Sequence, residues 1–497
     1  MRIRFVKTPS NKLAVQVVTR TRKDIVIHTQ IGSAKNEAEK QHLISQAQKY
    51  ILTHDPQQSL FGRPEISHLD EIEITQSQPL FLYRLLCSVY HRLGFDTFPD
   101  PVIRDLIVAR IYHPVSKMEI IDILEDSFGR RYSLKTVYRH LKKALENHLQ
   151  ECFQTSLIHF AKHDLNDSLR LVFYDVTTLA FDSQAKIGLK DFGFSKDHRF
   201  QDVQIVIGLV VNRDGFPLYF DIFKGSTFEG KTFIPVVEKI KKLLGNTDLT
   251  VVADAAMISR INVEELDRRR IGFIVGARLA NLPVTLQDTI SHTVSGIDQK
   301  TTVVDYLNHR LICQYLTKRA AKDKSDREKQ MNKANTVISS PSMISRRFRF
   351  VKAINGRYEV NTALIEKARK LEGIKGYLTN TELDENTIIE RYHDLWRIEK
   401  SFRITKSDLE ARPIFHQLDE TITGHLIIVF AGLAISRYLE MKTGTSLKKT
   451  IKVAQKVLTH KVTIVKTGES TRIETKIKDP ILCGQLEKLK ALEYQMS

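Results

Sequence analysis

Residues 169–178 read LRLVFYDVTT, and residues 249–256 read LTVVADAA. Each segment is a short apolar run that ends at an aspartate, Asp175 in the first and Asp254 in the second. Runs of this kind predict strands buried inside a sheet. Because ligand sites in α/β proteins form at strand ends, both aspartates are candidate site residues. For either aspartate taken alone, a role in a turn or a helix cap remains a common alternative.

The segments around these runs predict an α/β domain. Strands are expected at 203–211, 217–223 and 273–276, and helices at 233–244 and 258–270. Asp214-Gly215 has the composition of a hairpin turn. Residues 280–370 interrupt the series with polar, strand-like pieces. A long helix is then expected from Tyr392 to about Glu410, and a second, apolar on all faces and buried, over 424–439.

The first 150 residues predict a different architecture. Residues 1–30 alternate apolar and polar side chains, as in a small β meander, and 36–53 have helical periodicity. Helices are expected at 80–93, at 101–112, from a cap at Ser116 to Phe128, and from a cap at Ser133 onward. The last of these has an apolar stripe and a basic face, which is typical of a helix-turn-helix, although many helical hairpins share it. Its candidate DNA contacts are Lys135, Arg139 and Lys142.

The charge of the chain indicates a polyanionic partner. Its 497 residues contain 76 Lys and Arg against 58 Asp and Glu, a net charge of +18. The excess is concentrated in residues 1–24, 130–143 and 318–333 and in the tail from 441. One basic run is usually a solvated face, but four zones favour nucleic acid. The longest apolar run, 426–435, is about half of what spans a bilayer, so no membrane partner is expected.

Two further features bear on the cellular setting. The four cysteines are far apart, with no pattern for zinc or a disulfide framework, which favours a reducing cytosol. No apolar signal core follows the first basic residues, so no export signal is expected.

A third acid, Glu399, lies on the predicted helix that begins at Tyr392. Tyr392, Glu399 and Lys406 are seven residues apart, which places them on one stripe of a continuous helix. Arg403, four residues after Glu399, lies on the same side. Together with Asp175 and Asp254, Glu399 would supply the oxygen ligands that Mg²⁺ requires. A surface salt-bridge pattern is the alternative explanation for the stripe.

Several motifs together resemble a known family. Tyr392, Glu399 and Lys406 resemble the Y-x2-R-x3-E-x6-K signature of bacterial insertion-sequence DDE transposases, whose catalytic domain is ribonuclease H-like. The strings YHDLWRIEKSFRITKSDLEARPIFH, DVTTLAFDS, GFSKDHRFQDVQIVIGLVV and VVADAAMIS resemble one branch of that group. The resemblance implies that Asp175, Asp254 and Glu399 are catalytic metal ligands and that Tyr392 and Lys406 contact phosphates. Leu395 stands where the signature has Arg, so Arg397 is a candidate for that role.

The resemblance implies a ribonuclease H-like mixed sheet flanked by helices, with a β-rich insertion. The expected parts are a basic β/α segment (1–60), a helical DNA-binding domain (61–165), the first part of the catalytic domain (166–279), the insertion (280–375), the rest of the catalytic domain (376–440) and a basic tail (441–497).

The implied function is transposition. The enzyme would bind the inverted repeats of its element, cut with Mg²⁺, or Mn²⁺ as a substitute, and join 3′-hydroxyl ends to target DNA. A homodimer or higher assembly in a bacterial or archaeal cytoplasm, at the nucleoid, is expected. Two alternatives stay open: a ribonuclease H-like nuclease without strand transfer, and an inactive transposase-derived DNA-binding protein. Trp396, the only tryptophan, would either stack on an extruded base or pack in a helix core.

Overall fold

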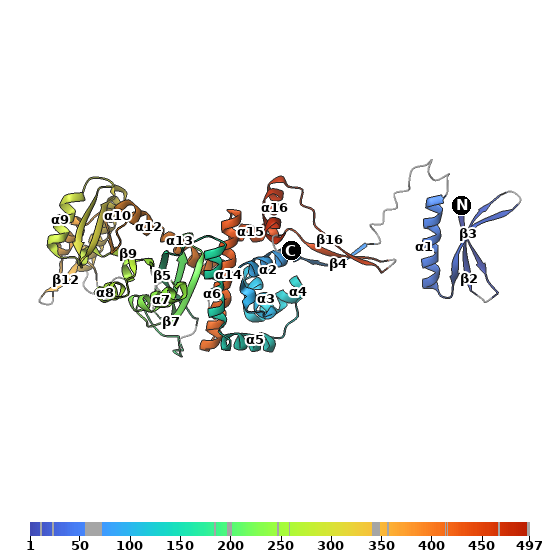
Figure 1. The fold of residues 1–497 in the computed structure, drawn as a ribbon, viewed down its shortest axis with the longest axis horizontal. Helices are drawn as coiled ribbons and strands as arrows, with labels where there is room; N and C mark the ends of the chain where they lie inside the picture. Colours follow the sequence, from blue (N-terminus) through green and yellow to red (C-terminus); the bar gives the residue numbers. More distant parts are fainter. Residues whose placement is uncertain are drawn as a thin grey trace. The chain divides into compact units, whose positions relative to one another are not determined.

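The computed structural model describes the chain except for residues 10–11, 22–23, 55–71, 183–184, 196–200, 246–247, 258, 340–347, 355–356, 413, 415, 466–467 and 495–497. The chain divides into two compact units. The small unit comprises residues 1–78 and 458–475, and the large unit comprises residues 79–457 and 476–497. Figure 1 shows the elements of both units.

The small unit contains two three-stranded antiparallel sheets. The first has the order β1-β2-β3, which confirms the predicted meander, and α1 packs on it through Val15, Val17, Ala47 and Ile51. Its elements are β1 (Arg2–Lys7), β2 (Leu13–Arg20), β3 (Ile25–Ala34) and α1 (Glu37–His54). The second sheet, β16-β15-β4, pairs strands far apart in sequence, namely β4 (Ile72–Gln78), β15 (Thr459–Ile464) and β16 (Ser470–Glu474).

Five helices open the large unit, and local signals set their ends. They are α2 (Leu80–Arg92), α3 (Pro101–Tyr112), α4 (Lys117–Phe128), α5 (Leu134–Glu146) and α6 (Leu149–His163). The Ser116 and Ser133 hydroxyls accept hydrogen bonds from the Glu119 and Thr136 amides and begin α4 and α5, as predicted. Gly129, at φ 67°, ends α4.

An eight-stranded mixed sheet forms the centre of the large unit, which confirms the α/β class. The strand order is β10-β11-β14-β9-β8-β5-β6-β7; β5, β8 and β9 run parallel and the other neighbours antiparallel. The strands are β5 (Leu171–Ala180), β6 (Gln204–Asn212), β7 (Pro217–Lys224), β8 (Thr250–Ala253), β9 (Gly272–Ala277), β10 (Thr301–Tyr306), β11 (His309–Tyr315) and β14 (Ile374–Thr379). Helices α7 (Glu229–Leu244) and α8 (Arg260–Arg268) follow β7 and β8.

The predicted end of the first strand at Asp175 is wrong. Strand β6 pairs with β5 from Val172 to Ala180, whereas β8 pairs with it only as far as Tyr174. Hydrogen bonds to β6 therefore extend β5 beyond Asp175, as far as Ala180. The Asp214-Gly215 turn between β6 and β7 is confirmed, with Gly215 at φ 76°.

In its described residues the insertion is not β-rich, which corrects the prediction. Its helices, of 11, 23 and 9 residues, exceed its strands, of 6, 7, 4 and 4 residues. The helices are α9 (Val284–Val294), α10 (Thr317–Ser339) and α11 (Thr362–Lys370), and a hairpin joins β12 (Val351–Ile354) to β13 (Arg357–Val360). The basic stretch 318–333 lies on α10, whose strong polarity hides any apolar periodicity. Strands β10 and β11, with β14, extend the central sheet.

The helix predicted from Tyr392 to Glu410 is also not continuous. It consists of α12 (Glu385–His393), α13 (Trp396–Arg403) and a π-helical segment, Ile404–Asp408. Between α12 and α13 the amides of Leu395 and Arg397 bond to carbonyls three residues earlier, which tightens the backbone. Such i to i+3 bonding and π segments leave no mark in a 3.6-residue apolar pattern.

Helix α14 (Asp419–Thr443) is the buried apolar helix expected over 424–439. By length and composition it could span a membrane, but 94% of its most apolar window is buried in the structure. It packs between the sheet and helices α2, α3 and α5 (Figure 1). The predicted tail, 441–497, is folded into α15 (Leu447–Ala454), β15, β16 and α16 (Pro480–Tyr494).

Candidate active site

Two parallel strands bring Asp175 and Asp254 together. Tyr174 on β5 is level with Ala253 on β8, and each aspartate is the next residue of its chain. Since neighbouring strands are about 4.8 Å apart, the two carboxylates lie side by side at the end of β8. Asp175 is half-buried and Asp254 is exposed. Each accepts a hydrogen bond of 2.7 Å from the amide of the following residue, Val176 or Ala255.

Tyr392 reaches this pair across the next strand. Its hydroxyl donates a 3.0 Å hydrogen bond to Oδ1 of Asp254. Gly276 on β9 makes the approach possible, because a Cβ there would collide with the Tyr392 hydroxyl and lie 3.0 Å from its ring. Burial, and next the negative charge of Asp254, raise the pKa of Tyr392, so the hydroxyl stays protonated and acts as a donor.

Glu399 approaches from the helical side. It lies in the first turn of α13, where a carboxylate is favoured by the helix dipole. Ile398 and Phe402 anchor this helix in the core, and the Ser401 hydroxyl donates to the carbonyl of Gly215 in the β6–β7 turn at 3.2 Å. The hairpin turn therefore fixes where Glu399 stands.

One cavity of about 520 Å³ unites these side chains, and we call it the carboxylate cavity. Asp175, Asp254, Glu399 and Tyr392 all line it, together with the exposed Trp396 at its edge. The three carboxylates are oxygen donors of the kind that hard divalent cations prefer. Among the residues that the structure describes, however, no three potential metal-binding groups are clustered closely enough to enclose an ion.

Two basic residues of the cavity were not predicted as site residues, although Arg319 belongs to the basic stretch 318–333. Lys375 on β14 lies over the ring of Tyr392 at 4.6 Å, and Arg319 in the first turn of α10 lines the same wall. Burial, and next Arg319, lower the pKa of Lys375, whereas Asp254 and Glu399 oppose this shift. The only sequence signal for Lys375 is a single charge inside the apolar strand IKGYLT.

The other predicted DNA contacts lie outside the carboxylate cavity. Arg397 is half-buried, and its Nε donates to Asp394 at 3.1 Å. Arg403 is exposed and lines a separate surface cavity with Lys400 and Lys448. Lys406 is half-buried in the π-helical segment. The stripe therefore brings only Tyr392 and Glu399 to the two aspartates.

Lys135, Arg139 and Lys142 are all exposed on α5, opposite a buried stripe of Val137, Leu141 and Ala144. The exposure of these three side chains agrees with the basic face predicted for this helix. Contact of these side chains with DNA stays a prediction.

The fold and the cavity define a class: a mixed α/β domain that gathers three acids from two parallel strands and a following helix. A family model described as the transposase DDE domain matches residues 167–433, more than half of the 497-residue chain. The chain belongs to this family of DDE transposases.

Comparison with curated proteins found no match. Among solved structures, the chain is similar to a piggyBac transposase, determined by cryo-EM in a synaptic complex with hairpin DNA. The TM-score is 0.39 at 8% sequence identity, with 76% of this chain and 79% of that chain covered.

Proposed function

We propose that this protein is an insertion-sequence transposase of the Y-x2-R-x3-E-x6-K group that cuts the ends of its element and joins them to target DNA. The observation that carries the proposal is the meeting of Asp175, Asp254 and Glu399 in one cavity within the matched family domain. The strand order supports a ribonuclease H-like core, because β5, β6 and β7 form an antiparallel meander and β8 and β9 run parallel to β5.

The three acids would hold Mg²⁺, or Mn²⁺ in its place. When bound, the metal would supply Lewis-acid activation of the attacking and leaving oxygens of an in-line displacement at phosphorus. The same site could then serve both cutting by water and joining by a 3′-hydroxyl, since both reactions are displacements of this kind. Tyr392 would orient Asp254 through its hydrogen bond and keep one of the carboxylate oxygens directed toward the sheet.

DNA would be held by the basic surfaces outside the cavity. Helix α5 would act as a recognition helix through Lys135, Arg139 and Lys142, and Arg397, Arg403 and Lys406 would contact phosphates near the cut. Synapsis of two element ends would require a homodimer or a larger assembly. The proposed setting is the cytoplasm of a bacterium or archaeon, at the nucleoid.

Strand transfer tests this proposal most directly. Purified protein is incubated with Mg²⁺, a supercoiled plasmid and a pre-cut duplex that ends in the border sequence of the coding region with a free 3′-hydroxyl. The proposal predicts covalent joining of the duplex to the plasmid, and none with Asp175→Asn. Hydrolysis without joining would instead indicate a nuclease. Binding without either reaction would indicate an inactive DNA-binding descendant.

A further inference from the structure

Helix α13, which carries Glu399, needs anchors of its own. It is 8 residues long, and irregular backbone borders it on both sides. The tightened segment that follows α12 precedes it, and the π-helical segment Ile404–Asp408 follows it. A continuous helix fixes the orientation of each turn through its neighbours, but such irregular segments interrupt that regularity. The direction in which Glu399 points is therefore set by the lateral contacts of α13.

Three of these contacts lie on one side of α13. Successive helical side chains are about 100° apart, so Ile398, Ser401 and Phe402 share a side. Ile398 and Phe402 pack in the core, and Ser401 bonds to the β6–β7 turn. By the same spacing Lys400 lies on nearly the opposite side of the helix, with Glu399 between the two sides. A contact made by Lys400 therefore limits rotation of α13 on the core.

Lys400 is held by Glu440, a buried acid of α14. Its Nζ lies 2.9 Å from Oε2 of Glu440, which is 8% exposed. The same oxygen accepts a 2.7 Å hydrogen bond from Nη1 of Arg437, and Oε1 accepts one of 3.3 Å from the amide of Leu447. A buried carboxylate with these partners on both oxygens has little freedom to move. It therefore gives the amine of Lys400 a fixed point of attachment.

Arg437 connects this acid to the hairpin turn. Arg437 is buried, and it donates to the carbonyls of Asp214 at 2.9 Å and Gly215 at 3.1 Å. Gly215 leaves room for the guanidinium, because a Cβ there would lie 2.8 Å from Nη2 of Arg437. Ser401 donates to the same carbonyl of Gly215. The turn, α13 and α14 therefore meet in one polar network centred on Glu440.

We propose that Glu440 is a positioning residue for the metal site. Through Lys400 and Arg437 it fixes the rotation of α13 and keeps Glu399 directed into the carboxylate cavity. Glu440 is not among the described residues that line that cavity, so it acts on a metal only through Glu399. This role rests on the proposed function, because it treats Glu399 as a metal ligand.

Metal binding in the absence of DNA tests the role of Glu440. Mn²⁺ is titrated into the full-length protein, and the unbound ion is measured by its EPR signal. The site that counts is the one that Asp175→Asn abolishes. Glu440→Gln should weaken binding to this site by about tenfold, the lower end of the cost of removing groups that orient metal ligands. A merely structural role would lower the temperature of thermal unfolding and leave the affinity of the folded protein for Mn²⁺ unchanged.

Lys400→Met separates position from charge. Glu440→Gln removes a negative charge, which by Coulomb interaction alone would weaken the binding of a cation. Lys400→Met removes a positive charge next to Glu399, which by charge alone would strengthen it. Because both changes break the same contact, the positioning role predicts weaker binding in both variants. The double variant should then bind about as weakly as each single variant, since the two effects are not additive.

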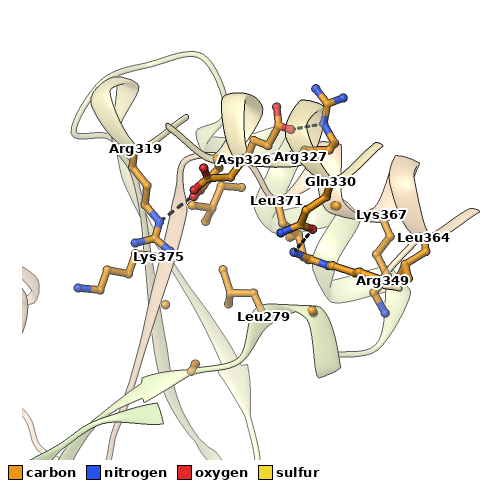
Figure 2. A pocket seen from close by; sticks show the side chains of 17 residues that line it. Leu279, Arg319, Asp326, Arg327, Gln330, Arg349, Leu364, Lys367, Leu371 and Lys375 are labelled. Carbon is orange, nitrogen blue, oxygen red and sulfur yellow. Dashed lines mark hydrogen bonds and ion pairs between the residues drawn. The ribbon is translucent and has the colours of Figure 1, made fainter. Parts of the chain in front are cut away.

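The matched control is an ion pair of the insertion, Arg327 with Glu372. Their side chains are 14% and 15% exposed, and both line a second cavity, of about 380 Å³, that we call the insertion cavity. Figure 2 shows Arg327 at this cavity. Neither residue is among those described as lining the carboxylate cavity. Glu372→Gln removes one negative charge, as Glu440→Gln does, and should lower stability without changing the affinity for Mn²⁺.

The outcomes distinguish this role from the proposed function. Weaker binding in Glu440→Gln and Lys400→Met, with wild-type binding in Glu372→Gln, supports the positioning role. Unchanged or tighter binding in Lys400→Met overturns it, even where Glu440→Gln binds more weakly. If Asp175→Asn abolishes no Mn²⁺ site, the metal site of the proposed function is refuted and the positioning role with it. Strand joining by the wild type, combined with unchanged affinity in both variants, overturns the positioning role alone.

Discussion

The large unit contains two clusters in which side chains of like charge lie close together. One is a cluster of acids that is open to solvent, and the other is a cluster of bases that is buried. Asp175, Asp254 and Glu399 share a cavity that opens to solvent. Lys117, with Arg110, is sealed against α14, at 6% and 4% exposure, near two histidines, His416 and His425. The Nζ of Lys117 and the Nε of Arg110 have no hydrogen-bond partner among the described residues.

The two clusters differ in whether counter-ions can reach them and reduce the repulsion between their like charges. An open cavity admits counter-ions, so its acids can stay charged and serve chemistry. In the sealed cluster Glu410 offsets only part of the effect of burial on Arg110, and burial lowers the pKa of Lys117 to about 7 and that of His416 to about 4. A cluster of like charges therefore indicates a functional site where it is open to solvent, and a loss of folding stability where it is buried.

The largest expected effect follows from neutralising the open acids. Asp175→Asn, Asp254→Asn and Glu399→Gln should each lower Mg²⁺-dependent cleavage of border DNA by roughly 10³-fold, which corresponds to the several kcal/mol that metal catalysis supplies. Stability should change by no more than about 1 kcal/mol, because Asp254 and Glu399 are exposed and Asp175 is only half-buried. Gel-based cleavage rates and urea unfolding measure the two quantities.

Asp305→Asn is the matched control, since Asp305 is exposed on β10 and lines neither cavity. It should cleave as the wild type does. Full activity in any one of the three acid variants would show that the cavity does not form the site and would end the comparison.

A smaller effect is expected where the sheet positions Tyr392. Gly276→Ala places a methyl group against the Tyr392 hydroxyl, so the ring must move and Asp254 loses its hydrogen bond. Overpacking of this kind costs about 1–3 kcal/mol of stability. We expect cleavage to fall as well, by about 10- to 100-fold for a lost charge-assisted hydrogen bond.

Tyr392→Phe separates the two consequences. It keeps the ring and removes only the hydrogen bond to Asp254, so stability should stay close to that of the wild type while cleavage falls. Equal cleavage by Tyr392→Phe and the wild type would show that this hydroxyl does not orient Asp254.

The two regions also show what could be predicted from sequence. The helix ends at Ser116, Gly129 and Ser133 were predictable because capping depends on residues one to three positions away. The end of β5 was not, because its hydrogen bonds come from β6, about thirty residues later in the chain. Asp175 and Asp254 were candidates because of their predicted positions at strand ends, and the family resemblance added Glu399 as their partner. The cavity that the three acids share is consistent with both arguments.

Tertiary proximity explains what was missed. Lys375 belongs to no motif, and only the pairing of β14 with β9 and β11 brings it to the cavity wall. Arg319 belongs to the basic stretch 318–333, but the charge of that stretch did not indicate its place beside the acids. Lys117 follows a helix cap, a position where a lysine is ordinarily exposed, and only the packing of the helices around it reveals its burial.

The sealed group predicts a pH dependence of stability. The pKa of Lys117 is lower in the folded protein than in the unfolded chain, so between pH 7 and 8.5 the unfolded state binds more protons. Stability should therefore rise with pH in this window, with a slope approaching about 1.4 kcal/mol per pH unit. Urea unfolding at several pH values measures this contribution.

Lys117→Met provides the reference, because it keeps the stem and removes the titrating group. The variant should be more stable than the wild type at pH 7, and the gap should narrow toward pH 8.5. A constant gap across the window would mean that folding does not lower the pKa of Lys117, which would contradict this account of the sealed cluster.

The smallest effect is expected for a third setting, cations that are fully solvated. Lys135, Arg139 and Lys142 are exposed on α5, so replacing any one with alanine should leave stability within about 0.5 kcal/mol of the wild type. If α5 contacts DNA, each change should reduce the salt slope of binding to a border duplex by about 0.9, as one phosphate contact is lost. Lys242→Ala on α7 is the control. A slope equal to that of the control in all three variants would leave α5 as a helix with a solvated basic face, and exposure alone would then not distinguish a DNA-binding cation from an idle one.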